Sequence, residues 1–225
     1  MNLALIIGQR PDRLRAMSAC LAGLGLATET CSGLAALQDY TGAPRVVLWD
    51  EDASDSPSAA LPATVAAAPI QLWILPPSVP MTQPGIRVPP PATEAQLLSA
   101  LVNAGYSLPD DAECAAISQT LHDLVDGDTA VVSELIESLF DTAKADLADY
   151  RARCAEQNWS AAGSLAHRIK GTARLAGCRS LTQLCERIEM AARLEGRTAI
   201  TPLNTLFEPA LDRLCAELAR LRQAS

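Results

Sequence analysis

The segment Leu165-Ala166-His167-Arg168-Ile169-Lys170-Gly171-Thr172 decides how the carboxy-terminal half of this chain is interpreted. At 3.6 residues per turn, Leu165 and Ile169 fall on one face of a helix, which suits the interior of a helical bundle. His167 and Lys170 are three residues apart and therefore lie side by side on another face. The segment predicts a packed helix that carries an exposed histidine with an ammonium group beside it.

Two glycines and an arginine belong to the same surface as this histidine. Gly163 lies one turn before His167, and Gly171 and Arg174 follow it. Glycine inside a helix costs about 1 kcal/mol relative to alanine, so its presence here indicates that another molecule approaches closely. The neutral form of an imidazole can attack a phosphoryl group, and Lys170 can balance the charge of the phosphoryl oxygens. The alternative for a lone histidine is a surface residue without a role.

From Asp110 onward the chain has the periodicity of helices joined by short links. The predicted helices span residues 112–126, 129–156, 159–176, 179–195 and 202–222. Asp128 and Asn158 are candidate N-caps, Gly177 and Gly196 are candidate ends, and Pro202 is expected to begin the last helix. Long helices with short connections predict an all-α antiparallel helical bundle.

The first hundred residues alternate short apolar runs with helical segments. Strands are predicted over residues 3–7, 28–31, 46–49, 70–75 and 86–88, and helices over 11–24, 33–41 and 93–104 with Thr93 as N-cap. Such alternation predicts an α/β doubly wound parallel five-stranded sheet. Four prolines lie between the fourth and fifth strands, so the crossover helix expected there is predicted to be missing.

These patterns divide the chain into an α/β domain over residues 1–104, a linker over 105–111 and a helical bundle over 112–225. The net charge of the 225 residues is −8, which argues against a general nucleic-acid-binding surface. Residues 163–180 nevertheless carry +4, so the remainder sums to −12. A local basic patch on an acidic protein predicts an acidic partner.

The seven cysteines have no spacing typical of a disulfide framework or a metal site, and reduced thiols are expected. Cys178 and Cys185 are seven residues apart on one predicted helix, so both are expected to face the core. The apolar run Leu3–Ile7 is too short for a signal peptide or a membrane span. We therefore expect a cytoplasmic protein that has no contact with a membrane.

The pattern His-x-x-Lys-Gly followed by a hydroxyl residue resembles the family of histidine-containing phosphotransfer (HPt) domains. The resemblance covers about residues 112–222 and implies that His167 is the phosphoacceptor, with Lys170 and Gly171 beside it. It also implies that Glu189, 22 residues later, reaches the imidazole and fixes its tautomer. The residues expected to flank the docking face are Arg168, Arg174 and Gly163. His122 has no companion motif and is expected to be structural.

The amino-terminal half resembles a degenerate response-regulator receiver domain. Asp50 ends the third predicted strand, where receivers carry their phosphoacceptor aspartate. Gly8 and Gln9 stand where receivers have an acidic pair for Mg²⁺, and Val88 is followed by prolines without the expected lysine. Aspartyl phosphorylation at Asp50 is therefore not expected, and the domain is predicted to serve docking or to control access to His167.

The resemblances imply a phosphorelay intermediate that moves a phosphoryl group between aspartates through His167. The implied partners are receiver domains of response regulators and of hybrid sensor histidine kinases. No cofactor or metal is expected on this chain, Mg²⁺ is expected on the partner receiver only, and no autokinase activity is expected without a glycine-rich phosphate loop. One alternative is a binding module that inhibits or scaffolds a kinase or regulator. Another is a hydrolase that uses His167 as a general base, although no candidate nucleophile or metal cluster accompanies it.

Overall fold

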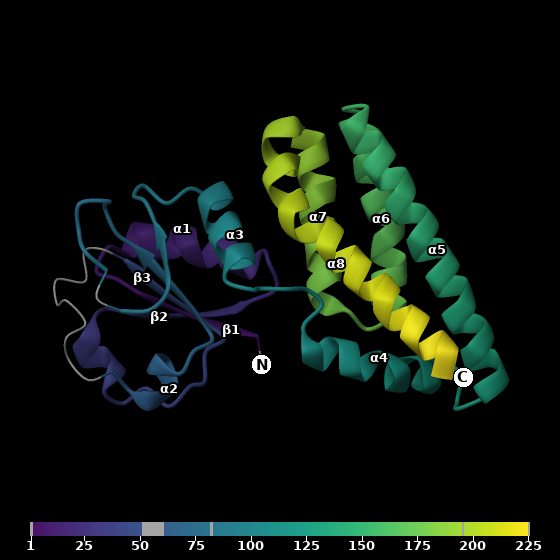
Figure 1. Cartoon of the computed structure of the whole chain (residues 1–225), viewed down its shortest axis with the longest axis horizontal. Coiled ribbons are helices and arrows are strands. Elements are labelled where there is room, and N and C mark those ends of the chain that lie inside the picture. The colour runs from purple at the N-terminus through teal and green to yellow at the C-terminus, as the bar shows by residue number, and fades with distance from the viewer. Residues whose placement is uncertain (1, 51–60, 82, 195, 225) are drawn as a thin grey trace. The chain divides into compact units, whose positions relative to one another are not determined.

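The chain folds into two compact units, Met1–Tyr106 and Ser107–Ser225. The computed structural model describes residues 2–50, 61–81, 83–194 and 196–224. The first unit contains a sheet with helices and the second contains helices alone (Figure 1). Each unit buries its own set of apolar side chains, so each has a core of its own.

Five parallel strands form the sheet of the amino-terminal unit, in the order β2-β1-β3-β4-β5. The strands are β1 (Leu3–Ile7), β2 (Ala27–Cys31), β3 (Val46–Asp50), β4 (Ile70–Ile74) and β5 (Ile86–Val88). Every residue of β1 and β3 is buried, as expected for central strands of a parallel sheet that is covered on both faces. The predicted five-stranded parallel α/β fold is confirmed.

Different helical elements cover the two faces of the sheet. Helices α1 (Pro11–Ala22) and α3 (Glu94–Asn103) lie over one face, and the short elements η1 (Leu34–Leu37) and α2 (Ala63–Ala66) lie over the other (Figure 1). On the second face, Leu37 of η1 and Val65 of α2 pack in one cluster with Trp49 and Trp73. The two indole rings are stacked, with their centroids 4.8 Å apart. Large aromatic rings thus fill space that longer helices would otherwise cover.

Two predictions about helices in this unit have opposite outcomes. The helix expected over residues 33–41 is wrong, because only the 3₁₀ turn η1 forms there. Gly33 enters that turn with a φ of 121°, and among the described side chains of residues 35–41 only Leu37 is fully buried. One buried side chain gains too little packing to offset the cost of helix nucleation. The missing crossover helix between β4 and β5 is confirmed for residues 75–81 and 83–85.

The carboxy-terminal unit is a helical bundle, as predicted. Its helices are α4 (Asp111–Leu124), α5 (Thr129–Ala155), α6 (Trp159–Leu175), α7 (Arg179–Leu194) and α8 (Arg197–Ala224). Helix α5 packs on α6 and α8, and α7 packs on the same two helices, so these four helices enclose one core. Helix α4 packs against α5 and α8. In the described part of the chain, no helix has the combined length and apolar composition needed to span a bilayer.

Most predicted helix ends of the bundle are confirmed. Asp128 caps α5 by accepting a hydrogen bond from the N–H of Ala130 (3.0 Å), and Asn158 caps α6 at the N–H of Ala161 (3.1 Å). Gly177 follows α6 with a φ of 74°, the left-handed conformation that glycine adopts without strain. Short, well-capped links of this kind hold consecutive helices antiparallel.

The start of the last helix was predicted wrongly at Pro202. Helix α8 begins at Arg197, directly after Gly196, and Pro202 lies inside it. Proline removes one hydrogen bond from the first turns of the helix. Ile200 and Leu203, on either side of it, are buried in the core, and their packing outweighs that loss.

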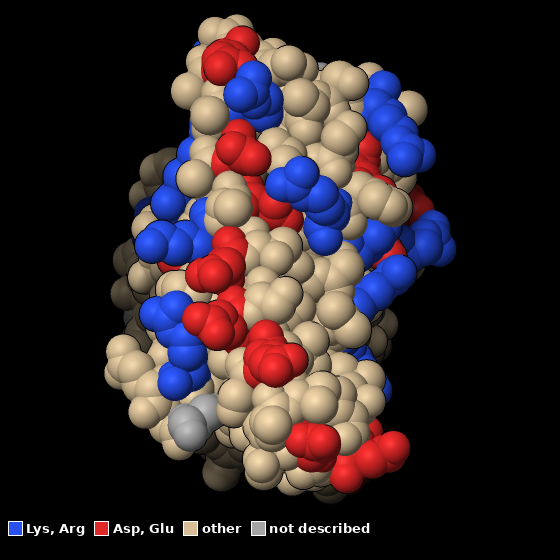
Figure 2. Space-filling view, turned by 90° about the vertical axis from the view of Figure 1, so that its right-hand side faces the viewer, with Lys and Arg blue, Asp and Glu red and all other residues tan. Residues whose placement is uncertain are grey.

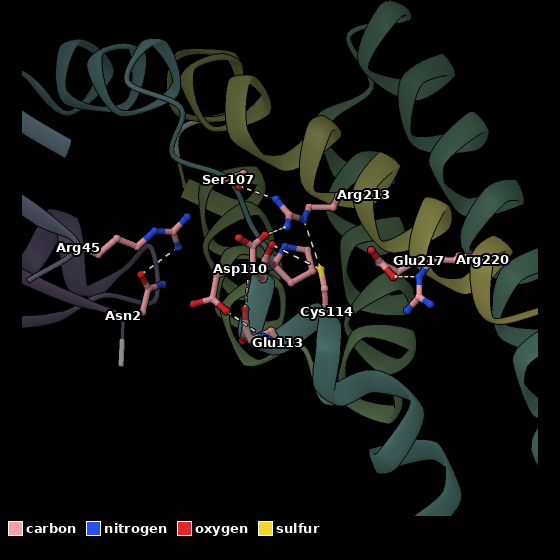
Figure 3. A network of polar contacts seen from close by, with 11 residues as sticks. Asn2, Arg45, Ser107, Asp110, Glu113, Cys114, Arg213, Glu217 and Arg220 are labelled. Atoms are coloured by element: carbon pink, nitrogen blue, oxygen red, sulfur yellow. Dashed lines mark hydrogen bonds and ion pairs between the residues drawn. The ribbon is translucent and has the colours of Figure 1, made fainter. Parts of the chain in front are cut away.

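Polar contacts attach α4 to the bundle. Glu113 on α4 accepts hydrogen bonds from the backbone N–H of Ser180 (2.9 Å) and from its hydroxyl group. Arg213 on α8 donates to Ser107 Oγ (2.7 Å) and to Cys114 Sγ (3.3 Å), as Figure 3 shows. These contacts join the start of α4 to both α7 and α8.

All seven cysteines are free thiols, and the two predicted to face the core do so. Cys178 and Cys185 are both completely buried. Burial raises the pKa of Cys178 to about 12. A thiol in this state behaves as a small apolar side chain and is a poor nucleophile.

Candidate functional site

Helix α6 positions the candidate site through the small residues of its buried face. Ala162, Ala166 and Ala173 are completely buried, and Ile169 lies among them. Small side chains allow α6 to approach its neighbours closely, so that groups on α6 and α7 come within contact distance. Leu165, which was expected in the interior, is only half-buried, because the buried face is centred on the alanines instead.

His167 projects from the opposite side of α6, and 70% of its side chain is exposed. Its Nδ1 lies 3.1 Å from Oε2 of Glu189 on α7. A carboxylate accepts hydrogen bonds, so this contact favours the tautomer with the proton on Nδ1 and the lone pair on Nε2. The geometry therefore combines a restrained ring orientation with a nucleophilic nitrogen on an exposed side chain.

Glu189 is the centre of the polar cluster around this histidine. Only 11% of its side chain is exposed, and its Oε1 lies 2.6 Å from the ammonium nitrogen of Lys170. Burial by itself would raise the pKa of Glu189, but the hydrogen bonds from Lys170 and His167 outweigh it and lower the pKa below its ordinary value. Glu189 is therefore held as a carboxylate beside the imidazole.

Lys170 is largely buried, although it lies beside an exposed histidine. Only 12% of its side chain is exposed, and its ammonium lies between Glu189 and Glu186, whose Oε1 is 3.9 Å away. Two carboxylates from α7 thus share this ammonium. Lys170 therefore holds Glu189 in place, and Glu189 in turn restrains the imidazole of His167.

The two glycines of α6 occupy different environments. A methyl group added at Gly171 would meet no atom of the chain within 4 Å. At Gly163 the same addition would come within 2.6 Å of the Ala192 methyl group on α7. Gly171 thus leaves the surface beside Lys170 open, whereas Gly163 is buried and permits close packing of α6 against α7.

The expected basic patch is largely neutralised by neighbouring helices. Arg168 donates to Asp146 on α5 (Nε to Oδ1, 2.9 Å) and also contacts Asp149, while Arg174 lies 3.0 Å from Glu186. On the face of the helical unit drawn in Figure 2, basic and acidic side chains lie side by side. The net charge of +4 counted over residues 163–180 therefore overstates the charge of this surface, because acidic side chains of α5 and α7 lie on the same surface and pair with its arginines.

Arg193 belongs to the site and was missed by the sequence interpretation. It follows Glu189 by one helical turn, its guanidinium lies 4.0 Å from Glu189 Oε2, and 79% of its side chain is exposed. A pocket brings it together with His167, and the lining residues are Ser160, Gly163, Ser164, His167, Glu189, Ala192 and Arg193. The i to i+4 spacing from Glu189 is the only signal in the sequence that could have indicated it.

The remaining candidate residues lie outside this cluster. Asp50 ends β3, as predicted, and is buried. His122 is half-buried near the end of α4, and its structural role stays a prediction. Within the described ranges, no group of three or more metal-ligating side chains forms a candidate metal centre.

Residues 134–224 match the family model of the Hpt domain. The carboxy-terminal unit carries an Hpt domain. The match begins within α5, runs to the end of α8, and includes His167, Lys170, Gly171 and Glu189. Hpt domains are phosphotransfer carriers that interact with receiver domains, so this unit has a role in two-component phosphotransfer.

The Hpt match does not extend to the amino-terminal unit. The five-stranded parallel sheet is compatible with a receiver-like fold, but no receiver family model matches it. No curated protein and no solved structure matches the chain.

Proposed function

We propose that the Hpt domain carries a phosphoryl group on Nε2 of His167, between the aspartates of two receiver domains. The observation that supports this most is an exposed imidazole whose Nδ1 is held by a buried carboxylate. This arrangement leaves the nucleophilic nitrogen available to a partner and limits rotation of the ring. Phosphoryl transfer depends mainly on such positioning and on charge compensation.

The transfer step is balanced without a proton leaving the site. Nε2 attacks the phosphorus of an aspartyl phosphate on the partner, an N–P bond forms, and the P–O bond breaks to release the partner's carboxylate. The ring then bears the phosphoryl group on Nε2 and the proton on Nδ1, so it gains positive charge. Glu189, already a carboxylate 3.1 Å from Nδ1, stabilises that charge. Onward transfer to a second receiver reverses these steps.

Two cations near His167 have separate roles, one in positioning Glu189 and one in binding the phosphoryl group. Lys170 holds Glu189 and, through it, the ring. Arg193 lies on the pocket with His167 and contacts Glu189 only loosely, at 4.0 Å, so its guanidinium is the cation best placed to turn toward phosphoryl oxygens. The Mg²⁺ that such transfers use would come from the partner receiver.

The wider roles follow from the same proposal. The partners are receiver domains of response regulators and hybrid sensor histidine kinases in the cytoplasm, and the chain itself acts as a carrier without autokinase activity. The amino-terminal unit acts as a pseudo-receiver that serves docking or controls access to His167. Gly171 leaves room for the incoming receiver, and Arg168 and Arg174 flank the docking face as members of ion pairs.

The test incubates the full chain with receiver domains that carry radioactive phosphoryl groups. We expect label on the wild type and on His122→Gln, a matched control that removes the only other histidine, and none on His167→Gln. Undiminished label on His167→Gln would overturn the proposal. A wild type that binds a receiver but takes no label would instead indicate the binding module, in which the chain scaffolds or inhibits its partner.

A further inference from the structure

The amino-terminal unit contains a polar pair at the point of the sheet where open α/β folds usually bind ligands. In the order β2-β1-β3-β4-β5, the chain leaves β1 and β3 toward opposite sides, and these neighbouring strands form the topological switch point. Gly8 directly follows β1, and Asp50 is the last residue of β3. The groups at this point therefore decide what the carboxyl edge of the sheet can bind.

The guanidinium group of Arg13, from the same unit, lies against the carboxylate of Asp50. The Asp50 side chain has 0% exposure, and its Oδ1 lies 2.6 Å from Nη2 of Arg13 on α1, whose side chain is 28% exposed. A buried carboxylate is costly unless an opposite charge compensates it. Arg13 supplies that charge and at the same time joins α1 to the end of β3.

Among the described residues, the space between Gly8 and Asp50 does not fit a second carboxylate for a metal site of the receiver type. A methyl group at Gly8 would lie 2.8 Å from Asp50 Cβ and 3.2 Å from the Leu14 side chain. A carboxylate at this position, which could share a divalent cation with Asp50, has no room without movement of the backbone. Mg²⁺ is held by carboxylate oxygens and waters, and among the described residues a guanidinium lies against the Asp50 carboxylate, where a cation would bind.

We propose that Arg13 is a built-in counterion that takes over the charge compensation a divalent cation gives in a metal-binding receiver. The pair holds the amino-terminal unit in a single metal-independent state. Asp50 then serves as the anchor of α1 and not as a phosphoacceptor, because its carboxylate is covered and committed to the guanidinium. This inference concerns the amino-terminal unit alone and is independent of the chemistry at His167.

The experiment follows thermal unfolding of the full chain by the near-ultraviolet circular dichroism of the stacked Trp49–Trp73 pair, which reports on this unit. Arg13→Met removes the guanidinium that lies 2.6 Å from the buried Asp50 carboxylate, and we expect the unfolding midpoint to fall by roughly 10 °C or more. Asp50→Asn added to Arg13→Met removes the buried negative charge and should recover most of that loss. Millimolar Mg²⁺ should leave the wild-type midpoint unchanged.

A matched control is available on the same helix. Arg15 forms an ion pair with Asp12, both of them exposed, so Arg15→Met should shift the midpoint by no more than about 2 °C. Three results would overturn the proposal: an Arg13→Met variant as stable as the control, a double variant no more stable than Arg13→Met, or stabilisation of the wild type by Mg²⁺. The second would mean that Arg13 acts through packing and not through charge.

Discussion

The Hpt domain and the parallel-sheet unit each contain a side chain able in principle to carry a phosphoryl group, and the two are built in opposite ways. His167 stands on the outside of a helix with 70% of its side chain exposed, whereas Asp50 lies at the end of a central strand with none exposed. Each contacts an oppositely charged or polarised group from a neighbouring helix, Glu189 for His167 and Arg13 for Asp50. Exposure, and not the chemical type of the group, separates the proposed phosphoacceptor His167 from the proposed structural residue Asp50.

The partner groups explain the rest of the difference. Glu189 engages one nitrogen of an imidazole that has two, so the second nitrogen keeps its lone pair for chemistry. Arg13 engages a carboxylate that is already surrounded by protein, so no part of Asp50 faces an incoming donor. A polar partner can thus orient one group for a proposed reaction and cover another.

The largest effect is expected from Glu189→Gln, which keeps the shape of the side chain and removes its charge. A hydrogen bond to a charged group contributes about 1.5–3 kcal/mol, so the rate of phosphoryl transfer should fall about 10- to 100-fold. Single-turnover transfer from a labelled receiver measures this rate. A transfer rate equal to that of the wild type would show that the charge of Glu189 does not prepare His167 for reaction.

The pH dependence of stability provides a second measurement on the same variant. The pKa of Glu189 is lowered in the fold from an ordinary value of 4.5. Its contribution to the free energy of unfolding is therefore complete above about 4.5 and is lost as the pH falls through the lowered folded pKa. The stability difference between wild type and Glu189→Gln should shrink over that acidic range, and chemical unfolding at several pH values will show whether it does.

The next effect concerns Gly8, the glycine beside Asp50. Gly8→Ala places a methyl group 2.8 Å from Asp50 Cβ, and overpacking of this kind costs about 1–3 kcal/mol. We expect a lower unfolding midpoint for the amino-terminal unit and unchanged phosphoryl transfer at His167. A Gly8→Ala variant as stable as the wild type would show that the space between Gly8 and Asp50 is less tightly packed than this short distance indicates.

Replacement of Gly171, which lies on the same helix as His167, should raise stability instead of lowering it. Gly171→Ala meets no atom within 4 Å and improves helix propensity, so the Hpt domain should gain up to about 1 kcal/mol in stability. Transfer from a receiver should nevertheless slow, because the added methyl group narrows the open surface beside Lys170. Chemical unfolding and transfer rates on the same preparation test both statements, and a variant that is stabilised without slower transfer would contradict the role given to the open surface.

The smallest effect is expected from Asp50→Asn. Transfer through His167 should stay within about twofold of the wild type, since only the amino-terminal carboxylate changes and a twofold change in rate corresponds to less than 1 kcal/mol. The same labelled-receiver assay applies. Loss of transfer would mean that the buried aspartate takes part in the chemistry, and the comparison between the two sites would fail.

Much of the fold was predictable because its signals are local. The periods of apolar residues indicated the strands and the five bundle helices, and Asp128, Asn158 and Thr93 were recognised as caps from residue type alone. The errors fell where local signals compete with packing. Residues 33–41 have helical composition without enough buried surface, and Pro202 has the residue type of a helix start although the buried residues on either side of it keep the helix continuous there.

Local spacing is enough to place His167 on one helix with Lys170 and Gly171, because those residues are within two turns and a helix puts them on one surface. Only the tertiary structure decided the charges around them. Acids on α5 and α7 neutralise the apparent basic patch, Arg193 joins the pocket, and Arg13 reaches Asp50 across the edge of the sheet. The physical reason is that side-chain pairing between elements depends on how closely and at what register the elements pack, which no local spacing specifies.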